Sequence, residues 1–218
     1  ESVTGQSVDA STVDTAVVGE YEVYYTATDA LNNVTTVIRY VRVVDTEDPV
    51  VTLNGNAVDS VEVYSTYTDV GIMITDNYYQ NLTATVTGTV DVSTVGDYVL
   101  EYSVTDGSGN GPVIVTRTVK VVDTEAPEIF SFVFDDGDDV EVPVNTKFTA
   151  PKFIITDNYY KGLVGTDKGT YFTTFTDGIA TSLGDYTYVL EVTDGSGNMS
   201  TFTLNIKVVD NEAPVLTL

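Results

Sequence analysis

The chain has 218 residues, of which 42% are hydrophobic, and it contains neither cysteine nor histidine. These absences exclude disulfides, thiol nucleophiles, zinc–thiolate sites and imidazole bases within this sequence. Its 33 acidic residues against 9 basic ones give a net charge of −24, which disfavours nucleic acid and anionic membranes as partners.

Three segments share one series of motifs. Each begins with Gly-Glu-Tyr or Gly-Asp-Tyr, has an Asp ten residues after the glycine and an Asn four residues later, and continues into Val-Val-Asp. The three glycines are Gly19, Gly96 and Gly184. The final aspartates, Asp45, Asp123 and Asp210, lie 78 and then 87 positions apart. A period of this size indicates one β-sandwich domain per repeat.

The Asp-x-Glu-x-Pro segments mark the boundaries between repeats, because proline ends one strand and stiffens the entry to the next. We expect residues 1–45 to be the C-terminal part of a repeat, and 46–123 and 124–210 to be complete repeats. Residues 211–218 then form the linker and first strand of a following repeat, so the chain is expected to be an excerpt of a longer protein.

Alternating apolar residues, rich in Val, Tyr, Ile and Phe, predict strands and an all-β fold. In the middle segment one face carries Tyr98, Leu100, Tyr102 and Val104, and the same pattern follows Gly19 and Gly184. The last strand is expected to face inward with Phe202, Leu204, Ile206 and Val208. Arg39 and Arg117 do not fit this pattern, since the alternation places each of these charged residues on the inward-facing side of its strand.

Residues 105–110 and 193–198 both read Thr-Asp-Gly-Ser-Gly-Asn, and a strand and Val-Val-Asp-x-Glu-Ala-Pro follow each. These motifs resemble the bacterial immunoglobulin-like and hyalin-type repeats. The resemblance implies tandem immunoglobulin-like β-sandwiches arranged end to end, in an extracellular protein of the cell surface or cell wall, such as an adhesin, an S-layer protein or a secreted polysaccharide-active enzyme. Residues 28–33 depart from the motif and read Thr-Asp-Ala-Leu-Asn-Asn.

The tyrosine of Gly-Asp-Tyr matches a tyrosine corner at the start of strand F, which makes the Thr-Asp-x-x-x-Asn segment the F–G loop. The B–C loop is expected where residues 75–79 and 156–160 both read Thr-Asp-Asn-Tyr-Tyr. In an immunoglobulin sandwich these two loops lie at the pole where the chain enters. Acidic groups from the linker, the B–C loop and the F–G loop should therefore converge there.

Ca²⁺ takes about six to eight oxygen ligands, whereas Mg²⁺ gives up its waters reluctantly, so the convergence predicts calcium sites. The predicted ligands at the first junction are Asp45, Glu47, Asp76, Asn77, Asp106 and Asn110. Those at the second are Asp123, Glu125, Asp157, Asn158, Asp194 and Asn198. The alternative is that these side chains only close turns by bonding the backbone. That alternative explains each motif singly, but not why mutually repelling carboxylates recur in all three elements of one pole.

Repeated turn motifs are not how catalytic acids are usually arranged, and we expect no enzyme activity. The leading interpretation is a structural spacer, stiffened by Ca²⁺ and contacting neighbouring repeats of the same protein. Alternatives are a module that binds a cell-surface glycan or protein, an accessory region of a secreted enzyme, and a polymerising subunit. The tyrosine pairs Tyr78-Tyr79 and Tyr159-Tyr160 could stack on sugars or pack over the junction. No apolar run approaches the roughly 20 residues that span a bilayer, so no membrane insertion is expected.

Overall fold

The computed structural model describes residues 3–216, except the side chain of Phe172. In this part of the chain the only helix is α1 (Tyr171–Thr174), and the predicted all-β fold is confirmed. None of the described residues forms a helix long and apolar enough to cross a bilayer. There are two compact units. One comprises Glu1–Asp59, Tyr67–Val90 and Asp97–Val119, and the other Ser60–Thr66, Asp91–Gly96 and Lys120–Leu218.

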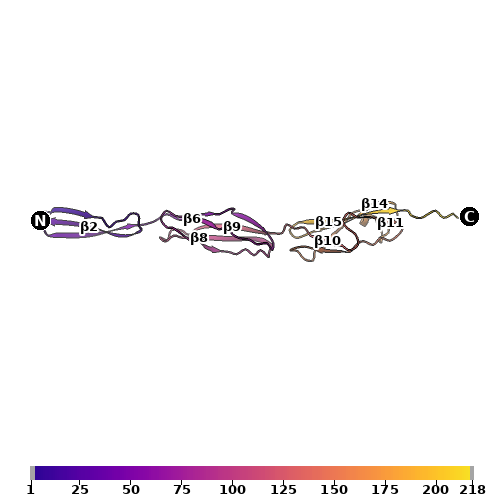
Figure 1. The fold of residues 1–218 in the computed structure, drawn as a ribbon, viewed down its shortest axis with the longest axis horizontal. Helices are drawn as coiled ribbons and strands as arrows, with labels where there is room; N and C mark the ends of the chain where they lie inside the picture. Colours follow the sequence, from indigo (N-terminus) through magenta and orange to yellow (C-terminus); the bar gives the residue numbers. More distant parts are fainter. Residues whose placement is uncertain (1–2, 217–218) are drawn as a thin grey trace. The chain divides into compact units, whose positions relative to one another are not determined.

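We call residues 1–45, 46–123 and 124–210 the first, middle and last repeats. The first repeat holds one antiparallel sheet, β1 (Val3–Asp9), β2 (Gly19–Asp29) and β3 (Val34–Val43), in the order β1–β2–β3 (Figure 1). Val23 is buried, but Arg39 directly opposite it on β3 is exposed. The inward-facing position predicted for Arg39 is therefore not buried, because among the described residues no second sheet covers this face.

The middle and last repeats each contain a two-stranded and a four-stranded sheet with corresponding strand orders, β4–β6 with β5–β9–β8–β7, and β10–β12 with β11–β15–β14–β13. The strands of the middle repeat are β4 (Val50–Leu53), β5 (Val58–Glu62), β6 (Ile72–Thr75), β7 (Thr85–Thr87), β8 (Gly96–Val104) and β9 (Val113–Val122). Those of the last repeat are β10 (Glu128–Ser131), β11 (Asp139–Pro143), β12 (Phe153–Thr156), β13 (Thr166–Lys168), β14 (Gly184–Thr193) and β15 (Met199–Val209). Residues 211–216 form no strand, and the rest of the strand predicted at Pro214–Leu218 lies outside the described residues.

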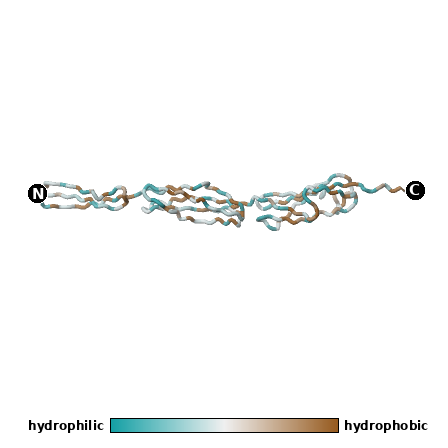
Figure 2. Tube along the Cα trace, viewed as in Figure 1, coloured by the Kyte–Doolittle hydropathy of each residue, from teal (hydrophilic) through white to brown (hydrophobic). Residues whose placement is uncertain are grey.

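The core follows the alternation read from the sequence. The predicted inward face of β15 is 0–3% exposed, at Phe202, Leu204, Ile206 and Val208. Figure 2 shows apolar positions recurring along the strands between more polar ones. The tyrosine corner is also present, since the hydroxyl of Tyr21 donates to the Val17 carbonyl at 2.8 Å and that of Tyr186 to the Ser182 carbonyl at 3.0 Å. These corners fix the start of β2 and β14, and with it the loops that follow those strands.

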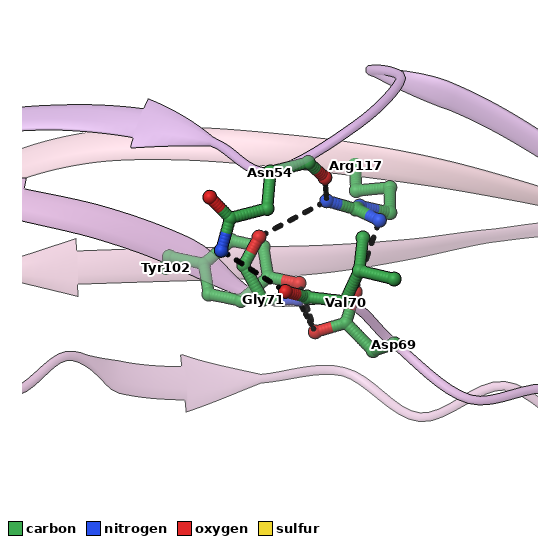
Figure 3. A network of polar contacts seen from close by, with 6 residues as sticks. All are labelled: Asn54, Asp69, Val70, Gly71, Tyr102 and Arg117. Carbon is green, nitrogen blue, oxygen red and sulfur yellow. Dashed lines mark hydrogen bonds and ion pairs between the residues drawn. The ribbon is translucent and has the colours of Figure 1, made fainter.

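Arg117, by contrast, is buried as the alternation predicts, since its side chain is 0% exposed inside the middle repeat. Its guanidinium donates to the carbonyls of Asn54 and Gly71 and forms an ion pair with Asp69 at 3.3 Å (Figure 3). The Tyr102 hydroxyl donates to the same carboxylate at 2.6 Å. Burial and this hydrogen bond to the Asp69 carboxylate raise the pKa of Tyr102 to about 12, so the phenol stays protonated. The network ties β8 and β9 to the segment before β6.

The last repeat fills the same space without charge. By alignment of the motifs, Ala150, Leu190 and Leu204 take the places of Asp69, Tyr102 and Arg117. Leu190 and Leu204 belong to the apolar core, and the partly buried Ala150 packs against it. Two packings, one polar and one apolar, thus support the same strand order. Buried ion pairs often contribute little net stability against well-packed apolar residues, which explains why both packings are tolerated.

Asp69→Ala should destabilise the middle repeat by about 3–5 kcal/mol, because it leaves the buried Arg117 guanidinium without its counter-ion. The triple substitution Asp69→Ala, Tyr102→Leu and Arg117→Leu, which installs the residues of the last repeat, should recover most of this loss. Amide hydrogen exchange of β8 and β9, measured by mass spectrometry, would follow both variants. A triple variant as unstable as the single one would contradict the equivalence of the two packings.

Candidate metal centres

An aspartate directly follows the third strand of the middle and last repeats, β6 and β12, and folds the next loop back on itself. Asp76 Oδ1 accepts hydrogen bonds from the amides of Tyr78 at 2.9 Å and Tyr79 at 2.7 Å. Asp157 Oδ1 accepts from Tyr159 and Tyr160 at the same two distances. Such Asx turns need only one carboxylate oxygen. The second oxygen, Oδ2, is buried and has no hydrogen-bond partner in either aspartate.

The F–G loop is closed by the Asp-x-x-x-Asn spacing found in the sequence. Asp106 Oδ1 accepts from the amides of Ser108 at 2.9 Å and Asn110 at 2.8 Å, and its Oδ2 accepts from the Asn110 side-chain amide at 2.6 Å. The Asp194 loop repeats this pattern with Ser196 and Asn198, at 2.8 Å for each bond. The loops are thus held by their own hydrogen bonds, with Asp106 and Asp194 both 8% exposed.

The linker before each of these repeats supplies a third aspartate. It is Asp45 before the middle repeat, 8% exposed, and Asp123 before the last repeat, 4% exposed. The F–G loop holds the backbone of this linker aspartate. The side-chain amide of Asn110 donates to the Asp45 carbonyl at 3.3 Å, and that of Asn198 donates to the Asp123 carbonyl at 3.1 Å. Asp45 Oδ1 also accepts from the Asn77 side-chain amide at 3.0 Å. Oδ2 of both linker aspartates is buried without a partner.

These three elements converge at one pole of each complete repeat. One carboxylate oxygen from each of Asp45, Asp76 and Asp106 lies within 4.8 Å of the others, and the set Asp123, Asp157 and Asp194 is arranged alike. Each set lies inside one compact unit. The structure therefore brings together the three acidic motifs as the topology predicts.

The other predicted ligands play different parts. The side-chain amide nitrogens of Asn77, Asn110 and Asn198 donate to neighbouring groups, whereas Asn158 Oδ1 is buried without a partner. Glu47 and Glu125 are exposed, and their carboxylates belong to neither of the acidic clusters found among the described residues. Their backbone amides donate to the carboxylates of the linker aspartates at 3.2 and 3.3 Å.

Further motif residues outside the two clusters form only local turns. Asp29 accepts from Leu31 and Asn33 at 2.8–2.9 Å as its counterparts do, but it is half-buried, whereas Asp106 and Asp194 are buried. Asp210 accepts from the Glu212 amide at 3.0 Å.

The charges of the second cluster act on one another. Burial raises the pKa of Asp123, and the nearby carboxylates of Asp157 and Asp194 add to the increase. Burial also works to raise the pKa of Asp194, but hydrogen bonds from Asn198, Gly197 and Ser196 outweigh it and hold that pKa below its ordinary value. Asp194 is thus a stabilised anion, while the hydrogen bonds to the Asp123 carboxylate do not offset its burial and the neighbouring charges.

The donor set fits a hard cation such as Ca²⁺. The buried oxygens without a hydrogen-bond partner at the two poles are four carboxylate oxygens and the amide oxygen of Asn158. An ion of this kind takes its ligands from carboxylates, amide oxygens and water. The residues that would hold it are Asp45, Asp76 and Asp106 in one pole, and Asp123, Asp157 and Asp194, with Asn158, in the other.

Residues 51–121 match the family model of the bacterial surface protein Ig-like domain. This match confirms the resemblance drawn from the motifs for the matched residues, which lie within the middle repeat. An uncharacterised 81.3 kDa protein of Acholeplasma phage L2 is 32% identical over 126 residues. That alignment covers 56% of this chain but only 16% of the phage protein.

Two solved cadherin structures are also similar. The human desmocollin-1 ectodomain is 15% identical, with 93% of this chain and 50% of that chain covered and a TM-score of 0.30. Domains EC1–4 of Drosophila N-cadherin are 12% identical, with 89% and 58% covered and a TM-score of 0.33.

Two substitutions in the second cluster should have opposite effects without calcium. Asp123→Asn removes an uncompensated charge, so it should stabilise the calcium-free last repeat. Asp194→Asn replaces an anion that the loop stabilises, so it should destabilise the same repeat. NMR-detected hydrogen exchange of β14 and β15 in the full chain would measure both. Equal losses of protection would contradict the unequal roles of the two carboxylates.

Proposed function

We propose that residues 1–218 form a non-catalytic spacer of an extracellular surface protein, such as an adhesin stalk or S-layer segment, in which Ca²⁺ at the two acidic clusters stiffens the junctions between repeats. The observation that carries the proposal is the set of buried carboxylate oxygens without hydrogen-bond partners, which recurs at corresponding positions in both clusters. A purely structural turn needs no such oxygens.

The electrostatics support a cation in particular. Carboxylates within a few ångströms of one another repel, and removing them from water strengthens that repulsion. A bound divalent ion supplies positive charge to the Oδ2 atoms of Asp45 and Asp76, which no donor in the structure satisfies. Hard oxygen ligands favour Ca²⁺, and the lack of cysteine and histidine in the whole sequence removes the ligands that favour zinc.

The stiffening follows from where the ligands are attached. In each cluster one aspartate belongs to the linker and two belong to loops of the following repeat. An ion shared by all three restricts rotation of the linker against those loops. Because the acidic motifs recur with each repeat, and catalytic acids would be expected once in a cleft, the arrangement favours a repeated mechanical role over catalysis.

Isothermal titration of the full chain should show two classes of calcium site or more, and Asp76→Asn and Asp157→Asn should each remove one. Asp185→Asn, which neutralises an exposed aspartate outside both clusters, is the matched control and should leave binding unchanged. At a calcium concentration about 100-fold above Kd, thermal stability should rise by about 2.7 kcal/mol. Absence of calcium-dependent heat in the wild-type chain would refute the proposal.

Small-angle scattering tests the mechanical half of the proposal. Chelation with EDTA should widen the range of conformations and change the maximum dimension, and added calcium should reverse both. If calcium binds but the scattering curve stays unchanged, the ions stabilise the repeats without stiffening their junctions.

A further inference from the structure

The two adjacent tyrosines that follow each B–C aspartate are both engaged in contacts. Their rings meet edge to face, with centroids 4.9 Å apart for Tyr78 and Tyr79 and 5.0 Å apart for Tyr159 and Tyr160. All four are half-buried. The backbone amides of each pair are the donors held by Asp76 or Asp157, so the aspartate that offers a partnerless oxygen to the cluster also fixes the position of the tyrosines.

The first tyrosine of each pair reaches the preceding repeat. The Tyr78 hydroxyl accepts a hydrogen bond from the Val18 amide at 3.1 Å, and the Tyr159 hydroxyl accepts one from the Val95 amide at 3.3 Å. Val18 and Val95 occupy the same position, immediately before the glycine of the tyrosine corner. Each contact lies within one compact unit. Tyr159 also packs against Tyr64, with the ring centroids 6.0 Å apart.

The second tyrosine lies over the F–G loop of its own repeat. The hydroxyl of Tyr79 is 3.1 Å from Ser108 Oγ, and that of Tyr160 is 3.2 Å from Ser196 Oγ. Both rings press on the glycine before that serine. A Cβ added to Gly107 would come within 2.4 Å of the Tyr79 ring, and one added to Gly195 equally close to the Tyr160 ring. The first glycine of Asp-Gly-Ser-Gly-Asn is therefore required for the second tyrosine to close over the loop.

We propose that each tyrosine pair connects its repeat to the repeat before it, at the valine that precedes the tyrosine-corner glycine. We call this connection the latch, and we propose that a cation bound in the acidic cluster holds the tyrosines in the connecting position. The coupling rests on the proposed calcium binding. A cation held by Asp76 Oδ2 fixes the carboxylate whose Oδ1 holds the two tyrosine amides. When the cation leaves, repulsion within the cluster favours rotation of the carboxylate, which releases both amides and the tyrosine bound to Val18.

The first repeat provides an internal contrast. Its loop reads Asp-Ala-Leu-Asn-Asn, so Ala30 and Leu31 stand where the other repeats have the glycine and serine that receive the second tyrosine. The alanine methyl group would occupy the space of the tyrosine ring, and leucine offers no hydroxyl to it. The latch geometry of the other two repeats is thus specific to loops with glycine after the aspartate.

Distances between spin labels test the latch in the full chain, which has no cysteine of its own. Labels at Tyr40→Cys and Met73→Cys, both exposed in the wild type, report on the junction between the first and middle repeats. With calcium the wild-type distance distribution should be narrow. Gly107→Ala and Tyr78→Phe should broaden it toward the calcium-free wild-type distribution, while retaining calcium binding in isothermal titration. Gly195→Ala, the same change at the other junction, should leave it narrow.

The outcomes separate the latch from the calcium site. Narrow distributions in Gly107→Ala and Tyr78→Phe would overturn the latch while leaving calcium binding intact. Broadening accompanied by loss of calcium binding would also overturn it, because these residues would then belong to the metal site itself. If the wild type binds no calcium, the proposed function and the coupling both fail, whereas broadening by Tyr78→Phe in that case would still locate the grip at Val18.

Discussion

At the entry pole of each complete repeat, three aspartates bring negative charge into a space largely closed to water. Hydrogen bonds from nearby amides satisfy one oxygen of Asp45 and Asp76, but their second oxygens have no donor. Even after relaxation, removing an ion from water costs several kcal/mol, and like charges add to that cost. The rest of the pole is built around this constraint: tight Asx turns, glycines that admit a ring, and asparagines that brace the linker carbonyl.

In the part of the chain that the structure describes, buried charges are paired within the protein in the core of the middle repeat, but not at the entry pole. In the core of the middle repeat the Arg117 guanidinium contacts two backbone carbonyls and the Asp69 carboxylate, and the Tyr102 hydroxyl donates to the same carboxylate. The last repeat replaces this network with apolar residues and keeps the same strand order. At the pole, by contrast, both repeats keep the three aspartates, and the Oδ2 atoms of the linker and B–C aspartates have no hydrogen-bond partner among the described residues. This difference is why we assign a function to the pole and only a packing role to the arginine network.

The local features of the site are predictable because they depend on residues close in sequence. Asx turns at Asp76 and Asp106 involve amides two to four positions away, and the motifs give these directly. The predicted ligand Glu47 is exposed, and among the described residues its carboxylate is not part of the acidic cluster. The Glu47 amide donates to the Asp45 carboxylate, a local contact that closes a turn in the linker.

Sequence by itself determined the all-β class, the repeat period and the three acidic motifs, since alternation and turn chemistry act over a few residues. It also placed the motifs at one pole, because the topology of the sandwich is a property of the family. Only the tertiary structure decided which carboxylate oxygens lack partners, that Arg117 is covered while Arg39 is not, and that Tyr78 reaches Val18 sixty positions earlier. Those facts depend on distances between remote segments, which local propensities do not encode.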